Sequence, residues 1–167
     1  MAYLDELFDY KNRLMRDLVT NDRIIELLKD DSKPNRKPED YIYTQIFPFE
    51  YIPETVEDGV SFICFDVEVQ RSISKTYYDP ILYVWTFTHK SKIVLPEGGV
   101  RSDAIAAEIV KTINGSRFYG LGELEFYSTR RFAPIPDYHG RQMIFNARDF
   151  NRPHVTEKEI PANRKVW

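Results

Sequence analysis

Cysteine, histidine and glycine are scarce in this 167-residue sequence, which has one, three and seven of them, and long apolar runs are absent. The single cysteine, Cys64, excludes an internal disulfide and a cysteine-rich metal site, and it suggests synthesis in a reducing, cytosolic compartment. No stretch approaches the ~20 apolar residues of a membrane-spanning helix. The first residues, Met1-Ala-Tyr-Leu-Asp-Glu, are acidic and amphipathic, so we expect no secretory signal there.

An excess of charge of one sign is also absent, since 23 Lys and Arg against 26 Asp and Glu give a net charge of −3. This balance argues against a dedicated nucleic-acid binder, which usually has a strongly basic face. The basic residues form only small groups: Lys33, Arg36 and Lys37 in one loop, and Arg130-Arg131 with Arg117 and Arg141 elsewhere. We expect ordinary surface there, with weak, salt-dependent contacts to nucleic acid or an acidic partner as the alternative.

The few chemistry-bearing residues match no catalytic motif. No histidine has a second one at i+3 or i+4, so we expect exposed loop residues at His89, His139 and His154. The glycine pairs fit neither a GxGxxG nor a Walker loop, and they are expected to shape turns or bulges: Gly98-Gly99 and Gly120 with Gly122. Cys64 has apolar neighbours and is expected to be a buried structural thiol. Asp66 and Glu68 are expected to be solvated. We therefore predict no catalytic, cofactor-binding or metal site, and no enzyme.

Aromatic residues, in contrast, are abundant, with eleven Tyr and eleven Phe. They exceed what a single-layer core needs, and Tyr, Trp and Arg are favoured at protein interfaces. Tyr83, Trp85 and Phe87 lie on one face of a strand that is apolar on both faces, which suggests a central strand or one covered by a partner. A partner-binding face and a thick aromatic core are equally compatible with this pattern. If this face binds a partner, Arg130 and Arg131 are further candidate interface residues.

The hydrophobic periodicity predicts two consecutive helices, or one bent helix, over 3–30. An apolar stripe at helical spacing, interrupted by Lys11, is followed by Thr20-Asn21-Asp22 as an N-cap signal. After a Pro-containing loop over 30–40, alternation predicts strands over 41–47, 61–69 and 81–89, with a polar loop over 70–80. Residues 90–101 are expected to form a flap or a long hairpin.

The C-terminal half predicts a further helix over 102–114, with Ser102 as its N-cap and Asn114-Gly115 at its end. The spacing of Ile105, Ile109 and Ile113 predicts that this helix packs on the sheet. Strands are expected over 122–131 and 141–149. The order α(α)-β-β-β-α-β-β indicates a single α+β domain over 1–150, with helices in 3–30, sheet and second helix in 41–150, and a mainly antiparallel sheet.

Residues 151–167 form a polar segment in which Pro153 and Pro161 favour an extended path. Apart from Val155 and Ile160, its apolar material is at Val166 and Trp167. We therefore predict an extended assembly arm anchored by Val166 and Trp167, because a Trp supplies large contact area for little chain entropy. The alternative is a segment that lies along its own sheet edge.

The order and residue pattern of these elements over about 22–150 resemble those of the tail terminator family of long-tailed bacteriophages. "Tyr83-Val-Trp-Thr-Phe" resembles the family's third strand, which precedes a loop and then a helix, here "Ser102-Asp-Ala-Ile-Ala-Ala-Glu-Ile-Val-Lys-Thr-Ile-Asn". That helix ends at Asn114-Gly115, and a closing strand precedes Asp149-Phe150. The additional N-terminal helix and the segment after Phe150 depart from the smallest members, and they leave room for another neck component, such as a head-completion or connector protein.

The resemblance implies a non-enzymatic virion protein that forms a ring, typically hexameric, which caps the tail tube within the head–tail neck. The implied partners are further copies of the chain, the tail tube protein, a head-completion or connector protein and a sheath protein where the tail has one. DNA would pass through the lumen without sequence-specific binding. The runner-up is a small cytoplasmic α+β enzyme or ligand-binding domain whose pocket uses Trp85, Tyr83 and Arg130-Arg131.

Overall fold

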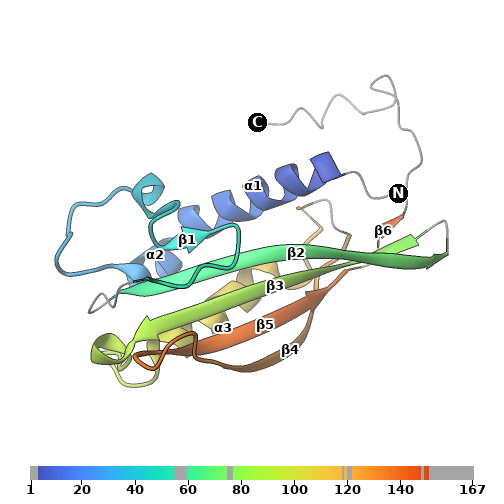
Figure 1. Cartoon of the computed structure of the whole chain (residues 1–167). Helices are drawn as coiled ribbons and strands as arrows, with labels where there is room; N and C mark the ends of the chain where they lie inside the picture. The colour runs from blue at the N-terminus through green and yellow to red at the C-terminus, as the bar shows by residue number, and fades with distance from the viewer. Residues whose placement is uncertain are drawn as a thin grey trace.

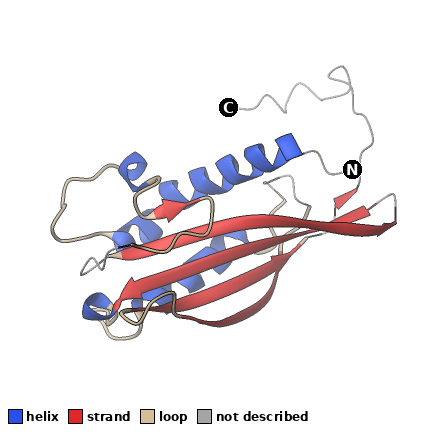
Figure 2. Ribbon diagram, in the orientation of Figure 1, coloured by secondary structure: helices blue, strands red, loops and turns tan. Residues whose placement is uncertain are grey.

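One six-stranded sheet carries helices on a single side, as the computed structural model shows (Figure 1, Figure 2). The structure describes residues 4–54, 60–74, 77–117, 119, 122–147 and 149–150. The helices are α1 (Leu4–Thr20), α2 (Asp22–Leu28) and α3 (Arg101–Ile113), with short 3₁₀ turns η1 (Pro38–Tyr41) and η2 (Lys90–Lys92). The strands are β1 (Ile46–Phe47), β2 (Ser61–Ser74), β3 (Tyr77–His89), β4 (Glu125–Phe132), β5 (Tyr138–Asn146) and β6 (Asp149–Phe150).

The strand order is β1-β2-β3-β5-β4, and β6 pairs with the start of β3. Among the strands of the described residues, β1 and β2 run parallel and the other neighbouring strands are antiparallel. The predicted α+β class, the mainly antiparallel sheet and the order of the elements are therefore confirmed.

The main core lies between the sheet and the three helices. Alternation along the strands turns Ile63, Phe65 and Val67 of β2, and Leu82 and Val84 of β3, toward that side. The helices contribute the other half of this cluster, with fully or nearly fully buried residues Leu14, Leu18, Ile24, Leu27, Leu28, Ile105, Ile109 and Ile113. The predicted packing of α3 through its three isoleucines is confirmed, since each has no exposed surface.

Local signals explain where the helices begin and end. The Asn21 side chain accepts hydrogen bonds from the backbone N–H groups of Arg23 and Ile24, so it ends α1 and caps α2. The N-cap of α3 is Val100, and the prediction of Ser102 there is wrong. Ser102 is buried inside the first turn, where its carbonyl accepts a hydrogen bond from the Thr86 hydroxyl.

Several predicted boundaries are wrong. Residues 41–47 contain only the two-residue β1, because the chain first turns through η1 and Tyr43. The expected loop over 70–80 is mostly strand, since β2 and β3 continue pairing as far as Ser74 and Tyr77. The last two long strands are β4 (Glu125–Phe132), which begins three residues later than predicted, and β5 (Tyr138–Asn146), which lies three residues earlier than predicted. The predicted arm over 151–167, with Val166 and Trp167, lies outside the described residues.

Candidate interaction surfaces

The sheet face that carries no helix is organised in rows by the strand register. One row across β2, β3, β5 and β4 contains Phe62, Phe87, Gly140 and Phe132, and the next contains Cys64, Trp85, Gln142 and Arg130. A third row contains Asp66, Tyr83, Ile144 and Ser128. The face therefore changes from aromatic to polar within three rows.

The aromatic end of this face is a second core. Phe87 has no exposed surface and lies against Phe62, Phe132 and Tyr138, with ring centroids 5.2–5.7 Å apart. Segments before β2 and before β5 cover these rings, and Tyr51 stacks on Phe47 at 4.0 Å. Trp85 is 8% exposed. Phe87 and Trp85 thus take part in a thick aromatic core, and neither presents much contact area to a partner.

The polar end of the face is open, and we call it the open face: Asp66, Glu68, Tyr83, Arg130 and Ile144. Tyr83 is half-buried, and its ring stacks on Trp85 at 5.9 Å. Burial, and then the neighbouring Glu68 carboxylate, raise the pKa of the Tyr83 hydroxyl. Arg130 donates a hydrogen bond to the Gln142 side chain, which holds its guanidinium over the same face. Tyrosine and arginine, which here share one sheet face, are residue types that are enriched in interface hot spots.

The sheet separates Arg131 from Arg130. Arg131 pairs in register with Arg141, whose guanidinium binds Asp103 of α3 at 2.8 Å, so this pair lies on the helical side. A single pocket made of Trp85, Tyr83 and both arginines is therefore ruled out by the register. Arg117 forms a separate ion pair with Glu123, at 2.5 Å.

The described histidines are not exposed loop residues, so that prediction is wrong. His89 ends β3, is buried, and accepts a hydrogen bond at Nδ1 from the Ser91 backbone N–H. Its ring packs edge-on against Tyr138, the residue opposite it in β5. His139 is half-buried in β5, and His154 lies outside the described residues.

The remaining candidates of the sequence occupy structural positions. Cys64 is fully buried, as predicted, and burial raises the pKa of its thiol to about 12. Asp66 is paired with Lys11 of α1 at 2.6 Å, which explains the one lysine in the apolar stripe of that helix. Gly98, Gly99 and Gly122 have positive φ and form turns, and Gly120 lies outside the described residues.

No group of three or more potential metal ligands occurs within the described part of the chain. Among the same residues, none of the helices has the length and hydropathy needed to cross a bilayer.

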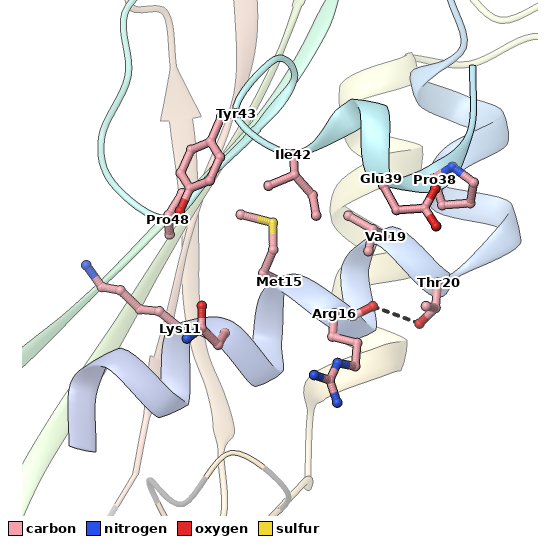
Figure 3. A pocket seen from close by; sticks show the side chains of 11 residues that line it. Lys11, Met15, Arg16, Val19, Thr20, Pro38, Glu39, Ile42, Tyr43 and Pro48 are labelled. Carbon is pink, nitrogen blue, oxygen red and sulfur yellow. Dashed lines mark hydrogen bonds between the residues drawn. The ribbon is translucent and has the colours of Figure 1, made fainter. Parts of the chain in front are cut away.

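A groove of about 450 Å³ lies between α1 and the segment from η1 to Pro48 (Figure 3). Met15 points from α1 toward Ile42 and Tyr43, and Val19 lies beside them. Polar side chains complete the lining: Lys11, Asn12, Arg16, Thr20 and Glu39. The Tyr43 ring at the rim is 61% exposed.

The wall opposite α1 is held by polar contacts. The Arg36 guanidinium lies 4.5 Å from the Tyr41 ring centre and donates hydrogen bonds to Gln45, Thr44 and the Asp40 carbonyl. Gln45 is buried, and its amide donates to the carbonyls of Leu28 and Ser61. The wall is therefore tied to α2 and β2.

Sequence reasoning missed this groove because it assigned 41–47 to a strand. The sequence shows the apolar stripe of α1, but it does not show that the segment from η1 to Pro48 packs beside this helix. The usable signal was Pro38 followed by acidic residues, which is typical of the start of a short helical turn.

Comparison with known proteins gives a family and no described function. A protein family described only by its name, YomW, matches residues 21–147, from the N-cap of α2 to the residue after β5. The name comes from a Bacillus gene of phage derivation. No curated protein matches the chain. Because the match spans well over half of the sequence, the chain belongs to the YomW family.

Proposed function

We propose that this protein is a structural virion component: a tail terminator that forms a ring, caps the tail tube and makes part of the head–tail neck. The phage-derived family name supports a phage role. The observed order of helices and strands is the one on which the resemblance to tail terminators rests. Another neck component, such as a head-completion or connector protein, is the alternative within the same class.

The observation that carries this proposal is the open face beside the aromatic core. A sheet covered by helices on one side only leaves its second side for contacts, and here that side offers Tyr83 and Arg130 at half-buried or exposed positions. Further exposed apolar side chains lie elsewhere on the chain, at Phe8 and Tyr43. Different patches on one subunit are what a ring requires, because a head-to-tail interface joins unlike surfaces.

The proposed partners follow from this role. Further copies of the chain form the ring, with six as the expected number. The tail tube protein lies below the ring, a head-completion or connector protein lies above it, and a sheath protein surrounds it in contractile tails. DNA passes through the lumen without sequence-specific contacts, and the assembled protein resides in the virion.

Size-exclusion chromatography with light scattering, followed by negative-stain microscopy, tests the proposal. We expect rings, alone or on the ends of purified tail tubes. Arg130→Ala together with Tyr83→Ala should weaken ring formation, whereas Tyr127→Ala on the edge strand β4 serves as the matched exposed control. A compact monomer that neither self-associates nor binds tail tubes would contradict the proposal.

We extend the proposal to an absence of hydrolase, transferase or redox activity. The runner-up enzyme needs Trp85, Tyr83 and both arginines in one pocket, and the register places Arg131 on the other side of the sheet. A broad substrate screen checks this point. Reproducible turnover that is abolished by changing His89, His139, His154 or Cys64 would establish an enzyme instead.

A further inference from the structure

We propose that the groove between α1 and the η1–Pro48 segment receives Val166 and Trp167 of a neighbouring copy. This inference rests on the proposed ring function and identifies one of its subunit contacts. The groove and the arm are different surfaces of one chain, so their contact is head-to-tail and can repeat around a ring.

The groove is preformed. Arg36 and Gln45 fix the wall that faces α1, and Lys11 on the α1 side is held by Asp66 at 2.6 Å. Met15 and Ile42 form apolar walls, and a thioether adapts well to an aromatic ring. A pocket with fixed walls binds an aromatic anchor with little ordering cost.

Tyr43 is the second observation that points to a bound group. Its φ is +57°, the left-handed region that a bulky residue rarely adopts, and it is the only described residue other than glycine with a positive φ. Burial of the side chain does not offset this backbone strain, because the Tyr43 ring is 61% exposed at the rim of the groove. A strained position that displays an aromatic ring to solvent suggests selection for contact with another molecule.

The arm carries matching chemistry. Val166 and Trp167 are its concentrated apolar material, and Arg164 and Lys165 precede them. The groove has apolar walls at Met15, Val19 and Ile42, and its charged lining residues are Lys11, Arg16 and Glu39. Apolar burial of Val166 and Trp167 therefore supplies the anchor.

The extended arm is longer than the distance from its start to the groove of its own subunit, so its length permits contact with the groove of the same or of an adjacent subunit. Phe150 pairs with Tyr77, and the Lys11 end of the groove lies near Asp66, which is opposite Tyr83. That separation along β3 is about 20 Å at the rise of a strand. Residues 151–167 span up to about 55 Å when extended.

The family match adds an independent argument. It covers residues 21–147, so α1 precedes the matched region and the arm follows it. The groove depends on α1 for one wall. The groove includes α1 and its proposed ligand is the arm, and both segments lie outside the region that the family model matches. This is expected if α1 and the arm serve one interaction.

A photo-crosslinking experiment on the full chain tests the contact and its direction. Benzoylphenylalanine replaces Trp167, and ¹⁴N- and ¹⁵N-labelled proteins are mixed before irradiation. We expect crosslinks to peptides of α1 or residues 38–48 that join a light chain to a heavy one. Crosslinks within one chain, or to the open face or any other surface, would overturn the proposal.

Substitutions give a second readout that spares the fold. Tyr43→Asn removes the ring and suits a left-handed backbone, so the thermal melt should stay at or above that of the wild type. Self-association should weaken about tenfold or more, as for loss of an interface anchor. Trp167→Ala should have a similar effect, and the double variant should be little worse than either single one, because both remove the same contact. Tyr127→Asn, also an exposed tyrosine, should change nothing.

The outcomes separate this inference from the proposed function. Rings that form normally in Tyr43→Asn, or fully additive effects of the two substitutions, would refute the groove contact while leaving the ring intact. A wild-type chain that forms no ring and binds no tail tube would refute both.

Discussion

Replacing Gly140 by alanine should destabilise the protein more than any surface change, because two backbones meet at this position. Gly140 lies opposite Phe87 in the row that crosses the aromatic core. A Cβ atom there would lie 1.7 Å from the carbonyl oxygen of Thr86 and 2.6 Å from the Cα of Phe87. Both are backbone atoms of the central strand β3, so no side-chain rotation can relieve the collision.

The cost follows from what must move. Overpacking a well-packed core costs roughly 1–3 kcal/mol, and a collision with backbone belongs at the upper end, about 3 kcal/mol. For a chain of this size each kcal/mol lowers Tm by about 2–4 °C, so we expect a loss of about 6–12 °C. Thermal and urea unfolding followed by far-UV circular dichroism measure it, with an unchanged dependence of unfolding free energy on urea.

Gly99→Ala is the matched control. Gly99 has φ +91° and nothing within 4 Å of a Cβ, so this substitution meets only the left-handed penalty of about 1–2 kcal/mol. A Gly140→Ala protein that melts within two degrees of the wild type, or above Gly99→Ala, would refute the close approach of β3 and β5.

Four further predictions concern the core and the cap of α2. Ile109→Ala should lower the unfolding free energy by about 2–5 kcal/mol, since Ile109 has no exposed surface, and a melt within a degree of wild type would remove α3 from the core. Cys64 should resist thiol reagents at pH 8 until the chain is denatured, and fast labelling of the folded protein would contradict its burial. Because folding raises the pKa of this thiol from 9.0 to about 12, its contribution to stability is present at neutral pH and declines as the pH rises through that interval, which unfolding at pH 7 and pH 10 can measure. Asn21→Ala should lower the unfolding free energy by about 1 kcal/mol in urea unfolding. Asn21→Asp should recover much of this loss, because an aspartate keeps the oxygen that caps α2 and loses only the hydrogen bond from the Asn21 amide to Thr112. Equal melts for the wild type and both variants would contradict the cap.

The sequence predicted those parts of the fold that depend on repeated burial. The isoleucines of α3 and the alternating residues of β2 report the core directly, because each apolar position contacts it. The stretch 70–80 escaped prediction because it is polar and has no such pattern. Its pairing uses backbone N–H and C=O groups, which almost every residue supplies.

The candidate surfaces were harder to predict because distant segments create them. The burial of His89 depends on Tyr138, which lies opposite it only after β5 pairs with β3. Whether Arg130 and Arg131 act together depends on the sheet, which turns neighbouring residues to opposite sides. The left-handed backbone of Tyr43 lies in the turn between η1 and β1, and the residue type at that position does not predict it.

The two hydrophobic clusters on opposite sides of the sheet make Trp85 a selective spectroscopic probe. The sequence has two tryptophans, and Trp85 belongs to the aromatic cluster without helices. In a Trp167→Ala protein, indole emission would therefore follow that cluster alone, while circular dichroism at 222 nm follows the helices of the other. Coincident transitions would show that the shared strands couple both sides into one cooperative unit. An earlier emission change would show that the aromatic side can loosen while the helical side persists, which is the behaviour expected of a face that becomes fully packed only on assembly.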